Sequence, residues 1–191
     1  MLDLFIPDVY QQSIYTINYK KLKKNGIKCL LFDLDNTIAP YKINEPDQNV
    51  KELFHRLEQD FKVIIISNSG KNRLRPFKEI LNVDVAFSSK KPLKGKYKKI
   101  LELYHFKIDE VACIGDQLLT DILGANRMGL TSILVNRVAK YEMFPTRVNR
   151  FIEKRILKEA LNLYNNILFM EKFILKKLAK QNILVSGVYY D

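Results

Sequence analysis

Two short motifs contain aspartates whose spacing suits chemistry on a phosphate group. Asp33 and Asp35 are separated by one residue and are followed by Thr37. Asp116 is followed five residues later by Asp121. A carboxylate can attack phosphorus and form an aspartyl-phosphate, but clustered carboxylates repel a phosphate anion unless a divalent cation lies between them. Because Mg²⁺ prefers oxygen ligands, these motifs predict phosphoryl transfer with Mg²⁺ as the cofactor.

The roles of individual residues follow from in-line attack on phosphorus. Asp33 is the predicted nucleophile, and Asp35 is the predicted general acid, which then acts as the base toward water. Ser67 is expected to hold phosphate oxygens, and Lys91 to supply a fixed positive charge beside the nucleophile. The predicted substrate-binding residues are Thr37, Ser67, Asn68, Lys91, Arg127 and Arg147.

The residues at these motifs follow apolar runs that are typical of buried β-strands. The predicted strands cover residues 28–32, 61–66, 83–87, 111–114 and 131–135. Helical spacing of apolar residues predicts helices at about 47–59, 73–81, 94–104 and 118–128. This alternation indicates βαβ units, so we predict an α/β fold, a Rossmann-like three-layer sandwich with a five-stranded parallel sheet. Ligands of such sheets bind at the carboxyl ends of the strands, where these polar residues lie.

Four motifs follow these strands in order: Asp33-x-Asp35-x-Thr37, Ser67, Lys91-Pro92 and Gly115-Asp116-x4-Asp121. In this order and on these strands, they resemble the motifs of the haloacid dehalogenase-like (HAD) hydrolases. The resemblance implies that Asp33, the backbone carbonyl of Asp35 and Asp116 bind Mg²⁺. It places Asp121 in or beside the same ligand shell. Phosphatases of the superfamily carry an aspartate at the position of Asp35, whereas the ATPase branch carries a threonine.

A closer resemblance is to one capless branch of subclass IIIA, the YqeG family. It is carried by residues 32–37, 115–121, 124–129 and 146–157, and the similarity spans most of residues 1–158. This family is related to the phosphatidylglycerophosphate phosphatases of mitochondria and plastids. The relation implies phosphatidylglycerophosphate, at a membrane surface, as the substrate.

The spacing between motifs leaves no room for the cap domain that many superfamily members insert. Only residues 38–66 separate Thr37 from Ser67, and only residues 68–90 separate Ser67 from Lys91. An open site suits a bulky phosphoester, since small metabolites usually gain from enclosure. We expect a helical N-terminal extension at residues 1–27, a HAD-like catalytic domain at 28–145 and a helical C-terminal extension at 146–191.

Composition favours a folded chain that attracts anions. The 191 residues include 32 Lys and Arg against 21 Asp and Glu, which gives a net charge of +11. Such a surface attracts nucleic acid, anionic headgroups or small phosphoesters. Cys29 and Cys113 fit no disulfide or zinc pattern, which favours a reducing compartment. Because the sequence shows no signal peptide and no run of about 18 apolar residues, we expect a cytoplasmic protein.

The C-terminal residues have an amphipathic pattern. Apolar residues from Ile152 to Leu178 recur at helical spacing, and lysines flank them between residues 172 and 180. Such a helix suits the inner face of an anionic membrane, as a peripheral contact. Packing on the domain, or against a second copy in a homodimer, is the alternative. Candidates for binding a second phosphate, with structural ion pairing or solvation as the alternative for each, are Arg127, Arg147, Arg150 and Arg155.

Three functions remain open from the sequence. The first is a Mg²⁺-dependent phosphomonoester phosphatase that acts on phosphatidylglycerophosphate. The second keeps this chemistry but acts on a soluble phosphorylated metabolite, such as a sugar phosphate or a nucleotide. The third is a basic protein that binds RNA or the ribosome. Nucleic acid is not the expected partner, because RNA binding has no need of Asp33, Asp35 and Asp116 together.

Overall fold

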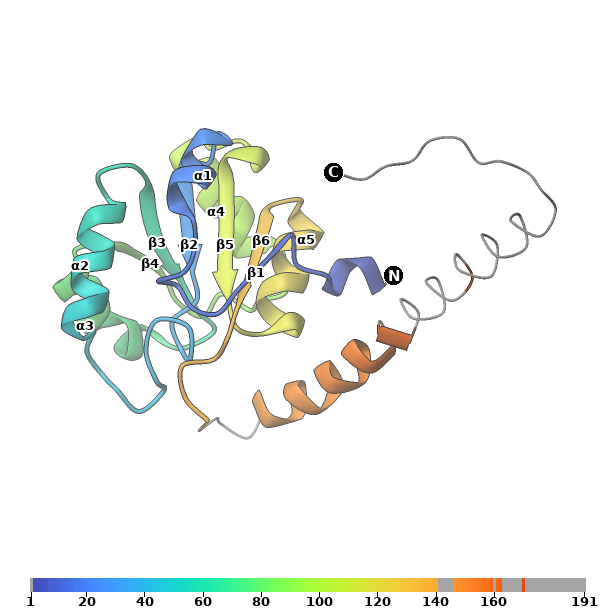
Figure 1. Ribbon diagram of the computed structural model, residues 1–191. Helices are drawn as coiled ribbons and strands as arrows, with labels where there is room; N and C mark the ends of the chain where they lie inside the picture. Colours follow the sequence, from blue (N-terminus) through green and yellow to red (C-terminus); the bar gives the residue numbers. More distant parts are fainter. Residues whose placement is uncertain (1, 141–145, 160, 163–169, 171–191) are drawn as a thin grey trace. The chain divides into compact units, whose positions relative to one another are not determined.

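A computed structural model describes residues 2–140, 146–159, 161, 162 and 170 (Figure 1). The chain divides into two compact units, Met1–Arg150 and Phe151–Asp191. In the second unit, residues 151–159 are helical, and the lysine-rich stretch expected further on lies outside the described residues. No helix among the described residues is both long enough and apolar enough to span a bilayer. The sheet and the candidate site belong to the first unit.

The first unit contains one sheet of six parallel strands, in the order β1-β6-β5-β2-β3-β4. The strands are β1 (Val9–Gln11), β2 (Cys29–Phe32), β3 (Lys62–Ile66), β4 (Asp84–Ala86), β5 (Val111–Gly115) and β6 (Thr131–Val135). The predicted parallel α/β fold is confirmed, and all five predicted strands are present. The predicted strand number was wrong, because the N-terminal segment contributes a sixth strand.

That additional strand, β1, lies within residues 1–27, for which the sequence predicts a helical extension. It pairs with β6 at one edge of the sheet. Asp8 fixes its position, since its carboxylate accepts hydrogen bonds from the backbone N–H of Ser132 at 2.8 Å and from the Ser132 hydroxyl at 3.0 Å. The helical parts of this segment are the 3₁₀ turn η1 (Leu2–Phe5) and the helix α1 (Tyr19–Lys24).

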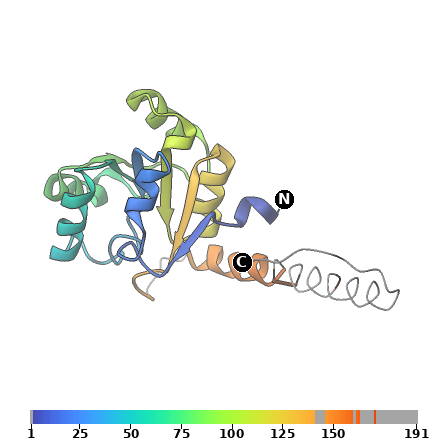
Figure 2. The ribbon, with the colours of Figure 1, turned by 45° about the horizontal axis from the view of Figure 1, so that its top comes forward.

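Helices cover both faces of the sheet, as the predicted three-layer arrangement requires (Figures 1 and 2). Besides α1, they are α2 (Gln48–Leu57), α3 (Lys71–Leu81), α4 (Gly95–Tyr104) and α5 (Leu123–Met128), with a 3₁₀ turn η2 (Ile108–Glu110) and a π-helical turn η3 (Leu118–Ile122). Helix α3 begins at Lys71, two residues before the predicted start at residue 73, so Pro76 lies beyond the first turn of the helix.

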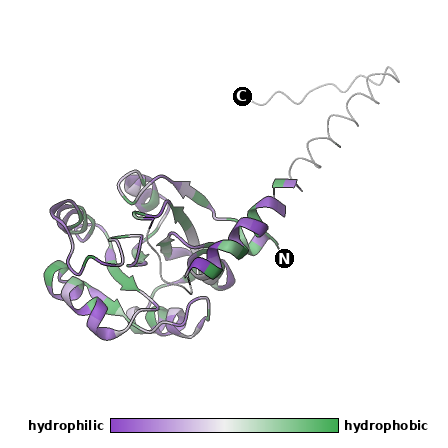
Figure 3. Cartoon of the chain, turned by 90° about the horizontal axis from the view of Figure 1, so that it is seen from below, coloured by the Kyte–Doolittle hydropathy of each residue, from purple (hydrophilic) through white to green (hydrophobic). Residues whose placement is uncertain are grey.

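Alternate residues of the strands enter two separate hydrophobic cores. Leu30 and Phe32 of β2 pack in one core with residues of α1, α2 and α3. Cys29 and Leu31 pack in the other with residues of α4 and α5. In Figure 3 the strands are largely hydrophobic, whereas the helices carry both kinds of residue. Burial on both faces explains why the strands appear in the sequence as continuous apolar runs.

The pairing of the central strands brings the chemical residues to one edge of the sheet. Strand β2 lies between β3 and β5, with Phe32 in register with Ile65 and Ile114. The residues that follow these strands therefore emerge side by side. Residues 38–66 form a loop, α2 and β3, and residues 68–90 form α3, β4 and their connections. All residues from 33 to 121 are described, and none of them forms a cap domain.

Candidate active site

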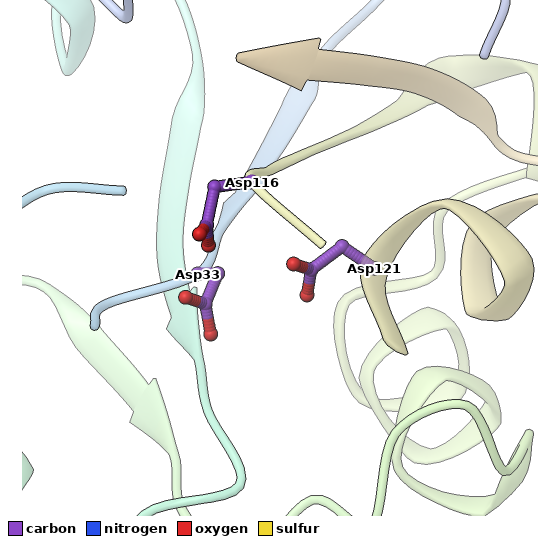
Figure 4. A group of neighbouring side chains, drawn as sticks. All are labelled: Asp33, Asp116 and Asp121. Atoms are coloured by element: carbon purple, nitrogen blue, oxygen red, sulfur yellow. The ribbon is translucent and has the colours of Figure 1, made fainter. Parts of the chain in front are cut away.

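Three carboxylates meet at the carboxyl edge of the sheet (Figure 4). Asp33 follows β2, Asp116 follows β5, and Asp121 lies in the π-helical turn η3. One oxygen of each residue lies within 4.8 Å of one oxygen of the other two, and all three residues are buried. The structure thus brings together three of the predicted metal ligands.

The close approach of Asp121 depends on a glycine and on an unusual turn. A Cβ atom on Gly115 would lie 2.2 Å from the Asp121 Cγ, so only glycine leaves room for this carboxylate. The backbone N–H of Gln117 donates to the Asp121 carboxylate at 3.0 Å. π-Helical turns are rare and are frequent at functional sites. Here the turn aims Asp121 back toward the end of β5.

Lys91 joins two of these carboxylates. Its Nζ donates to Asp33 Oδ1 at 2.6 Å, to Asp121 Oδ1 at 2.6 Å and to the backbone carbonyl of Ile66 at 3.0 Å. The Lys91 side chain is 2% exposed. Burial alone would lower the pKa of Lys91, but the Asp121 and Asp33 carboxylates outweigh it and raise that pKa. The lysine therefore holds a fixed positive charge beside the predicted nucleophile.

The cluster carries more negative charge than its own cations balance. Burial raises the pKa of Asp33 well above its usual range; Lys91 opposes the shift, and the neighbouring carboxylates add to it. Burial, followed by repulsion from Asp121, raises the pKa of Asp116 to about 7. A divalent cation among three buried carboxylates would relieve this repulsion, so the donor set fits Mg²⁺.

Asp116 has two partners of its own. The Thr37 hydroxyl donates to Asp116 Oδ1 at 3.1 Å. Arg150 donates to the Asp116 backbone carbonyl at 2.7 Å and also to its carboxylate. Thr37, a predicted substrate ligand, therefore contacts and orients an aspartate of the cluster. Arg150, which the sequence offers as a phosphate-binding candidate, lies at the same carboxylate.

The Asp35 side chain points to a different set of partners. Its carboxylate accepts hydrogen bonds from the Ser69 hydroxyl at 2.6 Å and from Arg73 Nε at 2.9 Å. It is not part of the cluster of three carboxylates. Because the expected metal ligand of Asp35 is its backbone carbonyl, its share in metal binding stays a prediction.

A pocket of about 460 Å³ opens beside these groups. The predicted residues that line it are Asp33, Asp35, Ser67, Asn68 and Lys91. The Asn68 amide is bonded to the backbone of Lys91, accepting from its N–H at 2.7 Å and donating to its carbonyl at 3.1 Å. Asn68 thus fixes the loop that carries the lysine.

Three predicted substrate-binding residues, Thr37, Arg127 and Arg147, do not line this pocket. Arg127, in α5, and Arg147 are exposed, and neither lines the pocket. Among the lining residues that the sequence did not predict, Ser69 and Arg73 contact Asp35. Ser69 belongs to the polar run after β3, which could have marked it. Nothing in the sequence distinguishes Arg73 from a solvated helix arginine.

Comparison with known proteins points to the same chemistry. Residues 2–139 match the family described as mitochondrial PGP phosphatase. The chain is 36% identical over 154 residues to the probable phosphatase YqeG of Bacillus subtilis, which covers 80% of this chain and 90% of that protein. It is 24% identical over 172 residues to phosphatidylglycerophosphate phosphatase 1, chloroplastic/mitochondrial, of Arabidopsis thaliana. The aligned region covers 82% of this chain and 48% of that protein.

A solved structure shares the fold. A protein of Porphyromonas gingivalis described as a predicted HAD-like family hydrolase superposes with a TM-score of 0.50 at 12% identity, covering 66% of this chain and 98% of that chain. The family match extends over more than half of the chain, and the 36% identity to YqeG extends over 80% of it. The resemblance drawn from the motifs is therefore confirmed. The chain belongs to the mitochondrial PGP phosphatase family of HAD-type hydrolases, and it is a phosphatase of phosphomonoesters.

Proposed function

We propose that this phosphatase requires Mg²⁺, uses Asp33 as its nucleophile and acts on phosphatidylglycerophosphate. The observation that carries the proposal is the placement of Asp33. It lies at a strand end with its carboxylate in a buried acidic cluster, beside a fixed lysine and at the wall of an open pocket. A nucleophile for phosphoryl transfer needs these surroundings, because negative charge must be neutralised around the phosphorus.

The residues divide the reaction into two displacements. In the first, an Asp33 oxygen bonds to phosphorus while the bond from phosphorus to the leaving oxygen breaks. Asp35 gives its proton to that oxygen. In the second, water attacks the aspartyl-phosphate, Asp35 takes a proton from the water, and Asp33 is released. Throughout, Lys91 and the Ser67 hydroxyl are the protein groups that face the phosphate oxygens.

Asp33, Asp116 and Asp121 would hold the Mg²⁺ ion, together with the backbone carbonyl of Asp35. When bound, the ion supplies positive charge that neutralises the phosphoryl oxygens. The cluster supports this assignment, because three carboxylates share one small volume and the pKa of Asp116 is raised to about 7.

Three observations favour a lipid headgroup as the substrate. No cap domain lies between the motifs, so the pocket can meet a phosphate that protrudes from a bilayer. The net charge of +11 favours approach to an anionic surface. The family match and the Arabidopsis relative both carry phosphatidylglycerophosphate, or its abbreviation, in their names. We therefore place the enzyme at the membrane surface while it works.

Phosphate release from purified protein tests the proposal. The substrates are phosphatidylglycerophosphate in mixed micelles and a panel of sugar phosphates and nucleotides, each with Mg²⁺ and with a chelator. We expect turnover of the lipid that exceeds turnover of every soluble compound, that stops on chelation and that is absent in Asp33→Asn. Preference for a soluble metabolite would overturn the lipid assignment. Full activity of Asp33→Asn would overturn the mechanism.

A further inference from the structure

Arg73 is bound to Asp35 more firmly than a surface arginine would be. Its Nε donates to Asp35 Oδ1 at 2.9 Å, and its second guanidinium nitrogen, Nη2, lies 2.9 Å from the same oxygen. The side chains are 13% and 19% exposed, so both are largely removed from water. Charge-assisted bonds in such surroundings are strong and directional.

The rest of the guanidinium holds the loop that follows Asp35. Arg73 Nη1 donates to the carbonyl of Ile43 at 2.7 Å, and Nη2 donates to the carbonyl of Pro40 at 3.4 Å. The guanidinium carbon also lies over two rings, 5.0 Å from the centroid of Phe77 and 6.0 Å from that of Tyr41. These contacts fix the guanidinium, and through it the Asp35 carboxylate.

The two oxygens of Asp35 have different partners. Oδ1 accepts from Arg73, which has only donors and therefore keeps that oxygen unprotonated. Oδ2 is 2.6 Å from the Ser69 hydroxyl, which can donate to a carboxylate and, after rotation, can accept from a carboxylic acid. Oδ2 is thus the oxygen that can carry a proton in one step and lack it in the next.

We infer that Arg73 is a positioning residue for proton transfer by Asp35. It anchors Oδ1 and so leaves Oδ2 as the oxygen that carries the proton, and Ser69 supports both protonation states of Oδ2. Asp35, Ser69 and Arg73 all line the pocket. As the bond from phosphorus to the leaving oxygen breaks, that oxygen keeps the electron pair and takes the proton from Oδ2. Water returns a proton to Oδ2 in the second displacement. The inference rests on the proposed function, in which Asp35 is the general acid.

Leaving groups of different basicity test this role. Nitrophenolate leaves without needing a proton, whereas phenolate gains much from one, and the two phosphate esters have similar shapes. We expect Arg73→Met to lower kcat for phenyl phosphate by about 100-fold, the loss that a misplacement of about 1 Å produces. The loss for 4-nitrophenyl phosphate should be roughly tenfold or less. Arg73→Lys should recover part of the difference, because a lysine can restore the charge but not the fork of donors.

Two further variants keep the test decisive. Arg75→Met is the matched control, since Arg75 lies on the same helix, is exposed and pairs with Glu79. It should leave both rates unchanged. Ser69→Ala removes the partner of Oδ2 without touching the guanidinium, and should show the same dependence on leaving group. It serves as the test if thermal melting shows that Arg73→Met is unfolded.

Equal losses for both esters in Arg73→Met and Ser69→Ala would mean a structural role only, and would overturn the inference. Unchanged rates in both variants would overturn it as well. Failure of the proposed function has a different signature. The wild-type protein would then hydrolyse neither these esters nor phosphatidylglycerophosphate, or Asp33→Asn would remain active.

Discussion

Replacing Lys91 by methionine should destabilise the protein far more than replacing an exposed lysine. The Lys91 ammonium lies 2.6 Å from Asp33 Oδ1 and 2.6 Å from Asp121 Oδ1, and its side chain is 2% exposed. At 2.6 Å and an effective dielectric constant of about 20, each attraction is on the order of 6 kcal/mol before desolvation is subtracted. Removing one member of a buried ion pair costs about 3–5 kcal/mol in practice.

The Lys91→Met substitution breaks two ion pairs, but we expect it to lower the free energy of unfolding by only about 3–5 kcal/mol. Asp33, whose pKa is already raised by burial, can take up a proton when the lysine is absent, and this limits the penalty. A loss of about 3–5 kcal/mol in a chain of this length corresponds to a fall in Tm of about 6–20 °C. Thermal and urea unfolding, followed by circular dichroism at neutral pH with a chelator, measure it.

Two companion variants make the result interpretable. Lys62 is paired with Asp84 at 2.5 Å, but these side chains are 37% and 44% exposed, so Lys62→Met should cost about 0–1 kcal/mol. The double variant Lys91→Met/Asp121→Asn removes one orphaned charge and should be more stable than Lys91→Met alone. The electrostatic account of the cluster is wrong if Lys91→Met has the same Tm as Lys62→Met. It is also wrong if the double variant is no more stable than Lys91→Met.

Three further predictions concern the cluster and a surface ion pair. Gly115→Ala should weaken Mg²⁺ binding and phosphate release, because its methyl carbon would occupy the place of the Asp121 carboxylate; titration calorimetry and a release assay measure both. Mg²⁺ at about 100 times its Kd should stabilise the wild-type protein by about 2.7 kcal/mol, and Asp116→Asn should lose most of this gain in a thermal-shift assay. The hydrogen bond from Lys62 lowers the pKa of Asp84 in the folded protein. Ionised Asp84 therefore stabilises the fold at pH values above its unfolded-state pKa. This stabilisation is lost as the pH falls through the folded-state pKa. Asp84→Asn should therefore cost up to about 1 kcal/mol near neutral pH and nothing in acid, as urea titrations at several pH values can show.

Each of these three predictions would be contradicted by a specific result. Normal Mg²⁺ affinity in Gly115→Ala would mean that the Asp121 carboxylate is free to move or is not a ligand. A full Mg²⁺ response in Asp116→Asn would place the ion elsewhere. An equal effect of Asp84→Asn at neutral and acidic pH would show that its pairing with Lys62 does not depend on charge.

The central strands could be predicted because burial on both faces produces uninterrupted apolar runs. Each run ends abruptly at a polar residue, such as Asp33, Ser67 or Asp116, and the parallel topology then brings those ends together. Strand β1 could not be predicted in this way, because three residues show no periodicity. Its position depends on a contact between Asp8 and Ser132 that only the folded chain creates.

The residues of the site could be predicted where a motif carries them, but their contacts could not. The motifs identify the carboxylates and Lys91, but not the π-helical turn that aims Asp121, since no local pattern distinguishes it from an ordinary helix start. The partners of Asp35 could not be found from spacing either. Arg73 reaches that carboxylate only because α3 begins at Lys71 and lies next to the loop after β2.

The short strand β1 also bears on how the molecule avoids associating with itself. It covers the outer side of β6 and presents only three residues of main chain beyond it. If residues 1–27 were deleted, the five residues of Thr131–Val135 would expose a row of unpaired N–H and C=O groups. Such a row is a template for pairing with a neighbouring chain. A shortened protein of this kind would keep every predicted catalytic residue and would still tend to aggregate through its sheet.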